Sequence, residues 1–194
     1  MMSWNYSIRR LAIFASLVAA LALSQALAQT NHQVQMIIED VEGREIPIFF
    51  YEPVGLLIQP GDTITFIAAS PHHTVTAYHA QQVKTHRVPE GVEPFSSPVV
   101  PIGETWSYTF TVPGTYEVWC GPHEQYGMAM RIVVGAPGGP AEAPITDFSP
   151  VGSFALSGVL LSMPELASSR IAQLGSVSFA EVKAAMIAAG GAPE

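Results

Sequence analysis

One short segment of this chain holds three side chains that can bind a soft metal ion. Cys120 is followed by His123 three positions later and by Met128 five positions after that. A thiolate, an imidazole and a weak axial thioether are ligands found together in copper sites. Cys120 is also the only cysteine, so it cannot form an internal disulfide. The spacing therefore indicates a copper site.

A copper site of this kind also needs a second imidazole. Two adjacent histidines, His72 and His73, stand upstream within residues 71–75, and either can supply it. Copper held by two imidazoles, a thiolate and a weak thioether changes between Cu(I) and Cu(II) with little movement of its ligands. Such a site favours electron transfer without substrate chemistry.

Three features together resemble the cupredoxins, the small blue copper proteins. The loop spacing C-x-x-H-x-x-x-x-M, with Gly127 before the methionine, is most similar to plastocyanin. An apolar run at residues 56–66 and a histidine followed by Thr-Val precede it in the order that the family shows. The resemblance extends from about residue 33 to residue 134. It implies one type 1 copper ion that carries single electrons between redox partners.

The resemblance also implies the ligand set, which is His73, Cys120, His123 and Met128. Cupredoxins usually have a histidine followed by Asn or Thr and then Val, as at His73. In the plastocyanin-like form a proline precedes the ligand, as at His72, so this alternative stays open. Met130 has the same strand parity as Met128, but the loop spacing favours Met128. The asparagine that donates to the sulfur in the family is absent from both alignments.

The central part of the chain has the pattern of short strands between Pro and Gly turns, which predicts an all-β, Greek-key β-sandwich. Residues 34–38 and 46–50 are rich in β-formers. Alternation in residues 106–111 places aromatic side chains on one face and hydroxyls on the other. The same alternation in residues 115–120 points the Cys120 thiol into the sandwich. Residues 79–101 are expected to be a long irregular connection.

The first 28 residues have the features of a signal peptide. Arg9 and Arg10 precede an apolar run at residues 11–23, and residues 26–28 form a small-residue cleavage site. The run is shorter than the ~20 residues of an ordinary membrane span. We therefore expect cleavage after Ala28, no membrane span in the mature chain, and a periplasmic or secreted protein.

The mature chain is strongly acidic. Removal of residues 1–28 takes away two of the 8 basic residues and none of the 16 acidic ones, which leaves a formal net charge of −10. This charge argues against nucleic acid and suits a redox protein partner of opposite sign, such as a cationic cytochrome. The resemblance places the edge of His123 near the surface as the electron port, and Glu124 is expected to add an acidic rim.

The character of the chain changes after the copper domain, which we assign to residues 29–134. Residues 135–144 have the composition of a linker, and residues 145–194 are expected to form an appendage with two short helices. Two capping boxes predict where these helices begin. The first consists of Ser162 and Glu165, and the second consists of Ser178 and Glu181. Gly175 and Gly190 are the predicted ends. Helices this short must pack on the sandwich, on each other or on a partner.

Other functions are less consistent with the sequence. Copper oxidases and nitrite reductases need further histidines in H-x-H pairs or beside the cysteine, whereas Trp119 and Gly121 flank Cys120 and no H-x-H occurs. We therefore expect no enzyme. Copper handling or storage, or a copper-domain subunit that docks on a redox complex, is the alternative. His79 and His86 are expected to be surface residues.

Overall fold

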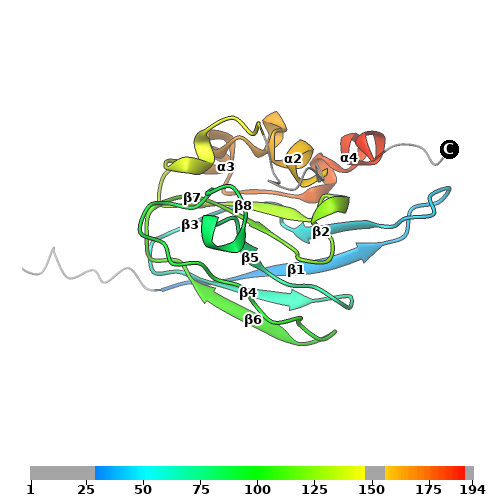
Figure 1. Cartoon of the computed structure of the whole chain (residues 1–194), viewed down its shortest axis with the longest axis horizontal. Helices are drawn as coiled ribbons and strands as arrows, with labels where there is room; N and C mark the ends of the chain where they lie inside the picture. The colour runs from blue at the N-terminus through cyan, green and yellow to red at the C-terminus, as the bar shows by residue number, and fades with distance from the viewer. Residues whose placement is uncertain (1–28, 147–155, 191–194) are drawn as a thin grey trace, which may run out of the picture.

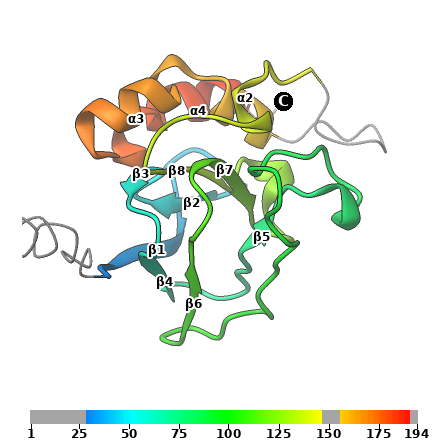
Figure 2. The ribbon, with the colours of Figure 1, turned by 90° about the vertical axis from the view of Figure 1, so that its left-hand side faces the viewer.

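Two β-sheets face each other, and short helices near the C-terminus cover the outer face of one of them (Figure 1, Figure 2). This arrangement is seen in a computed structural model that describes residues 29–146 and 156–190. The predicted signal peptide, residues 1–28, lies outside the described residues. Within the described ranges, no helix is long and apolar enough to cross a membrane. The predicted β-sandwich with a helical C-terminal appendage is confirmed.

The first sheet has four strands. Their spatial order is β2 (Ile48–Glu52), β1 (Asn31–Glu39), β4 (Thr63–Ala68) and β6 (Thr105–Thr109). β1 runs parallel to β4, and the other neighbours are antiparallel. In β6 the predicted alternation is confirmed, because Trp106 and Tyr108 pack against the core while Ser107 bonds Thr65 across the exposed face at 2.9 Å.

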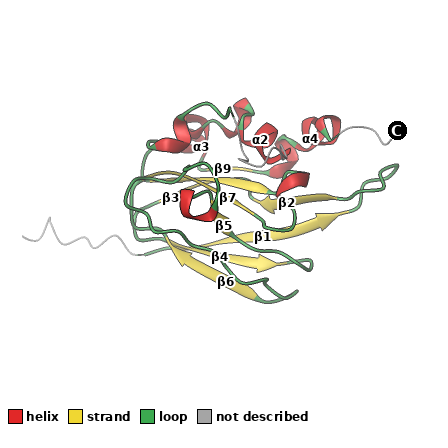
Figure 3. Ribbon diagram, in the orientation of Figure 1, coloured by secondary structure: helices red, strands yellow, loops and turns green. Residues whose placement is uncertain are grey.

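The second sheet has five strands and includes one from the appendage (Figure 3). Their order is β5 (Thr76–Ala77), β7 (Gly114–Trp119), β8 (Ala129–Val134), β3 (Gly55–Ile58) and β9 (Ser176–Val177). The irregular connection predicted for residues 79–101 is confirmed, with a short 3-10 turn, η1 (Ala80–Gln82), near its start and isolated β-bridges at Ser96 and Val100. Gln82 ties this turn to the far part of the connection, since its Nε2 donates to the carbonyl of Phe95 at 3.0 Å.

The core between the sheets is apolar and contains the thiol. Phe66, Phe110 and Tyr116 are 0–1% exposed, and each buried Å² of apolar surface contributes ~25 cal/mol to folding. Val118 and Cys120 follow Tyr116 at intervals of two along β7 and its end, and both belong to this core. The prediction that the thiol points into the sandwich is therefore confirmed.

A second core lies between the second sheet and the appended helices (Figure 2). The helices are α2 (Leu156–Leu161), α3 (Ser168–Leu174) and α4 (Lys183–Ala189). Leu160 and Ile171 are fully buried there, and the ring of Phe179 stacks on Phe50 at 4.1 Å. β7 is thus buried on both faces. The alternation of side chains along the strand predicts only its inward face.

One of the two capping boxes is confirmed and the other is wrong. The Ser178 hydroxyl accepts from the N–H of Ala180 at 3.2 Å, and Glu181 accepts from the N–H of Ser178 at 3.3 Å. The Ser162 hydroxyl instead donates to Gly158 at 2.7 Å, because Ser162 ends α2, a helix that the sequence did not predict. A 3-10 turn, η4 (Pro164–Leu166), separates α2 from α3. The stops at Gly175 and Gly190 are confirmed.

A buried ion cluster joins the outer face of the second sheet to the chain that covers it. The carboxylate of Glu117, on β7, accepts from both Arg87 and Arg131 and is 0% exposed. Arg131 also donates to the carbonyl of Leu166 at 2.6 Å, and Arg87 donates to the carbonyl of Ala141 at 2.7 Å. Glu117 and the two arginines therefore hold the segment after β8 and the turn before α3 against the second sheet.

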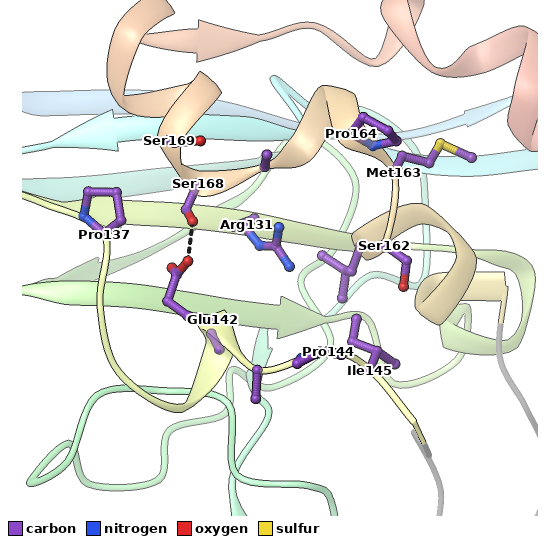
Figure 4. A pocket seen from close by; sticks show the side chains of 14 residues that line it. Arg131, Pro137, Glu142, Pro144, Ile145, Ser162, Met163, Pro164, Ser168 and Ser169 are labelled. Atoms are coloured by element: carbon purple, nitrogen blue, oxygen red, sulfur yellow. Dashed lines mark hydrogen bonds between the residues drawn. The ribbon is translucent and has the colours of Figure 1, made fainter.

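Arg131 also lines a cavity of about 440 Å³ between that segment and the helices (Figure 4). Glu142 closes one side of it, where its carboxylate accepts from the hydroxyl of Ser168 at 2.6 Å. The residues that line it are mostly small, with three prolines, three alanines and three serines among them. Residues 135–144 are held against the second sheet, because the N–H of Thr115 donates to the carbonyl of Gly138 at 2.8 Å and the N–H of Gly135 donates to the carbonyl of Ile58 at 2.8 Å.

We predict that Glu117→Gln lowers the free energy of unfolding by about 3 kcal/mol or more, because it leaves two buried guanidinium groups without their counter-charge. Urea denaturation of the metal-free protein measures this. The matched control is Glu181→Gln, since Glu181 pairs with Arg170 at an exposed position, where a loss of about 1 kcal/mol at most is expected. Equal small losses in both variants would contradict the prediction.

Candidate metal centre

Three metal-binding side chains converge at one end of the sandwich. The sulfur of Cys120 lies 3.5 Å from Nδ1 of His123 and 3.8 Å from Nδ1 of His73. The donor atoms of all three residues are within 4.8 Å of one another, and all three residues are buried. The structure therefore brings together three of the four predicted ligands through their donor atoms.

The loop from Cys120 to Met128 is closed by its own backbone. The N–H of Cys120 donates to the carbonyl of Met128 at 3.0 Å, and the N–H of Met128 donates to the carbonyl of His123 at 3.2 Å. A 3-10 turn, η2 (Glu124–Tyr126), ends at Gly127, whose φ of 98° favours glycine. Met128, the fourth predicted ligand, is 0% exposed and belongs to the same core as Cys120.

The position of His73 is fixed from both sides. Its carbonyl accepts from the N–H of Val100 at 2.8 Å, and its Nε2 lies 2.9 Å from Oγ of Ser70. An Nε2–H that donates to Ser70 leaves Nδ1 free for a metal, as is common in metal-bound histidines. His72 is exposed and lies outside the cluster. Ser70 was not predicted, because a serine three residues before a histidine carries no distinctive signal.

Thr74 makes a contact to the Cys120 sulfur, although the asparagine that donates to this sulfur in the family is absent from the chain. The N–H of Thr74 points to the sulfur of Cys120 at 3.3 Å, and its hydroxyl oxygen accepts from the N–H of Gly121 at 2.7 Å. The carbonyl of Thr74 accepts from the hydroxyl of Tyr51 at 2.7 Å. Thr74 therefore links the two segments that carry the donors.

Burial sets the protonation states of the donors. It lowers the pKa of His73 and of His123 to about 4, and it raises the pKa of the Cys120 thiol, although the N–H of Thr74 opposes that rise. Near neutral pH the metal-free cluster consequently holds two neutral imidazoles and a thiol. Metal binding must displace the thiol proton, so it is favoured by higher pH.

The donors fit a copper ion. Two atoms that each bind a metal at the usual 2.0–2.3 Å lie roughly 3.5–4 Å apart, and the sulfur-to-nitrogen separations of 3.5 and 3.8 Å agree with this. Thiolate and imidazole without any carboxylate are ligands for soft or borderline metals rather than for magnesium or calcium. A weak thioether donor from Met128 would complete the set that copper prefers in electron-transfer sites.

The outer side of His123 is covered by an aromatic ring. Phe49 stacks on the imidazole with ring centroids 4.2 Å apart and an angle of 20° between the planes. Tyr126 also stacks on Phe49, with ring centroids 5.1 Å apart. His123 keeps 8% of its surface exposed, which leaves a narrow accessible edge.

Two predictions about neighbouring polar residues are wrong. Glu124 does not form an exposed acidic rim, because it is 8% exposed, accepts from the hydroxyl of Tyr78 at 2.9 Å and pairs with Lys84. His79 is not a surface residue, because it is 7% exposed and its Nδ1 accepts from the N–H of Gln81 at 3.1 Å. Glu124 is buried because Lys84 of the long connection packs against the ligand loop, and His79 packs edge to face on the ring of His86 at 4.7 Å.

A two-sheet sandwich with a buried His-Cys-His cluster at the end of a strand defines the class of mononuclear copper proteins known as cupredoxins. The chain belongs to the plastocyanin/azurin family of copper binding proteins, which matches residues 39–135. The cofactor is therefore one type 1 copper ion, and the expected function, electron transfer rather than enzymatic catalysis, agrees with this family.

The relatives are pseudoazurins and plastocyanins. The chain is 34% identical over 117 residues to a putative pseudoazurin of Rhizobium leguminosarum bv. viciae, over 60% of this chain and 68% of the relative. It is 36% identical over 124 residues to the pseudoazurin of Paracoccus pantotrophus, over 62% of this chain and 77% of the relative. The structure of a Sinorhizobium pseudoazurin, 25% identical, superimposes with a TM-score of 0.53 over 72% of this chain and 100% of that protein.

We predict that the metal-free protein loses stability as the pH falls from 6.5 to about 4. In this range the unfolded chain binds protons at His73 and His123 while the folded chain does not, so the free energy of unfolding decreases with acidity. Urea denaturation at a series of pH values gives the slope. In His73→Leu the slope should be shallower, and an unchanged slope would contradict the prediction.

Proposed function

We propose that this protein is an exported electron carrier whose copper ligands are His73, Cys120, His123 and Met128. The observation that carries the proposal is the buried sulfur of Cys120 with two imidazole Nδ1 atoms directed at it. Copper, when bound, supplies one-electron redox chemistry, since Cu(I) and Cu(II) both accept this ligand set. The chain itself holds the donors in place and excludes water from them.

Electron exchange needs a rigid site with one accessible edge. Ser70 and Thr74 fix the donors on the upstream segment, and the backbone of Met128 closes the downstream loop. The exposed edge of His123, beside the exposed residues Gly121 and Pro122, offers a partner a close approach. This edge is the proposed electron port.

The spectrum of the mature chain, residues 29–194, loaded with Cu(II) tests the ligand set. We expect an intense blue thiolate-to-copper band with narrow copper hyperfine splitting, lost in Cys120→Ser and in His73→Ala. The matched control is His72→Ala, which should keep the band because His72 lies outside the cluster. A pale wild-type protein with ordinary copper signals would overturn the proposal and favour copper handling.

The charges on the surface support a cationic redox partner, such as a basic cytochrome. Within residues 29–146 and 156–190, each lysine and arginine side chain donates to a carboxylate or a carbonyl. In contrast, Asp40, Glu42 and Glu45 are exposed in the β1–β2 hairpin. This hairpin is close to the ligand loop, because Arg44 and Ile46 line one small cavity together with Tyr126.

We predict that the rate of electron exchange with a cationic cytochrome falls as ionic strength rises, because salt screens the attraction that steers the two proteins together. Stopped-flow mixing measures the rate constant. Glu45→Lys should lower it at low salt. Glu90→Lys is the matched control, because Glu90 follows Pro89, which contacts Gly114 at the opposite end of β7. A rate independent of salt would contradict steering by charge.

We also propose the organisation of the whole chain. Residues 1–28 act as a signal peptide that directs the protein to the periplasm or the exterior, residues 29–134 form the copper domain, residues 135–144 are the linker, and residues 145–194 are the appendage. The basis is the Arg9-Arg10 pair with the apolar run that follows, together with the change of composition after residue 134.

A further inference from the structure

The appended helix α2 is connected to the copper-ligand loop through a buried hydrogen-bond network, defined by Tyr78, Lys84, Glu124 and Ser157. We propose that these four residues are positioning residues for the metal centre, so that α2 is a structural part of the copper site. The inference rests on the proposed function, because it assigns a role in that same site. None of the four residues is among the proposed ligands.

Glu124 is the member of the network that lies in the ligand loop. It directly follows His123 and begins the turn η2, so its position restricts that of the histidine. Glu124 is 8% exposed, and a buried carboxylate is stable only when it is paired and hydrogen-bonded. The hydroxyl of Tyr78 and the ammonium group of Lys84 satisfy it. These two partners therefore determine where Glu124 sits.

Tyr78 is held firmly enough to act as a fixed support. It is 0% exposed, its N–H donates to the carbonyl of Glu117 at 3.0 Å, and its carbonyl accepts from the N–H of Arg87 at 2.9 Å. Its hydroxyl lies 2.9 Å from Glu124 and 3.1 Å from Oγ of Ser157. Since a carboxylate only accepts, the phenol donates to Glu124, and Oγ of Ser157 lies within hydrogen-bond distance of the same phenol oxygen.

Lys84 supports the loop from the other side. It belongs to the connection between Tyr78 and Arg87, whose two ends are joined by the backbone hydrogen bond described above. Its ammonium group pairs with Glu124 and lies 4.6 Å from the centre of the Trp119 ring. Trp119 immediately precedes Cys120. One cation is therefore in contact with residues next to two of the proposed ligands.

The appendage also packs directly on the ligand loop. A Cβ added to Gly127 would lie 2.5 Å from Cε of Met186 and 3.4 Å from Cβ of Leu156, so α2 and α4 approach the backbone of the loop without space between them. Gly127 directly precedes Met128. Helix α2 supplies both Ser157 of the polar network and Leu156 of this apolar contact, and the two act on opposite ends of the turn η2.

The network can be broken by removing single hydroxyl groups. Tyr78→Phe keeps the ring and removes the hydroxyl that bonds Glu124 and Ser157, and Ser157→Ala removes the hydroxyl that bonds Tyr78. The matched control is Tyr116→Phe, because Tyr116 is buried in the same sheet and its hydroxyl donates to the carbonyl of Val112 at 2.8 Å, with no part in the network.

Amide hydrogen exchange of the metal-free chain is the first readout. In Tyr78→Phe the N–H groups of Tyr126, Gly127 and Met128 should exchange about tenfold faster relative to those of β4, since a buried hydrogen bond to a charged group contributes at least this factor. In Tyr116→Phe the ratio of loop to β4 exchange should stay unchanged. An unchanged ratio in Tyr78→Phe would overturn the inference.

Loss of copper from the loaded protein to a chelator is the second readout. We expect Tyr78→Phe to release copper several-fold faster than wild type, Ser157→Ala to show a smaller increase, and Tyr116→Phe to match wild type. Equal rates in all four proteins would overturn the inference while a blue wild type upheld the proposed function. If the wild type bound no type 1 copper, the proposed function would fail, and the exchange ratio would still decide whether the network holds the loop.

Discussion

Burial of the Cys120 thiol beside two neutral imidazoles is the interaction on which the rest of the structure depends. A thiol at the end of β7 is directed into the core by strand alternation, and the loop that follows must return over it without leaving polar groups unpaired. Backbone hydrogen bonds from Cys120 to Met128 and from Met128 to His123 meet that requirement. The fold of the chain itself thus places the donors.

The same constraint explains why the surroundings of the site are so heavily bonded. Ser70 holds the imidazole of His73, Thr74 bridges the two donor segments, and Phe49 covers His123. Each contact limits how far a donor can move when the charge of the metal changes. A carrier of single electrons gains from this rigidity, because less of its structure has to rearrange at each transfer.

Much of the site could be predicted from the sequence, because its ligands lie at fixed spacings in one loop and at the end of one upstream segment. The alternation in β6 and β7 and the Ser178 capping box were also local signals, and they were correct. Glu124, His79 and Ser162 differ from these local predictions. Tyr78 and Lys84, which bind the Glu124 carboxylate, lie 46 and 40 residues away in the chain, a distance that local patterns do not bridge. His79 packs against the ring of His86, and Ser162 ends α2, a helix that the sequence does not predict.

Strand β9 comes from the appendage and pairs with β3, which would otherwise be the edge of the second sheet. An unpaired strand with an apolar neighbouring face is a template for association with other chains. By covering both the edge and the face, the appendage removes this template, so we expect the solubility of the copper domain to depend on its C-terminal extension.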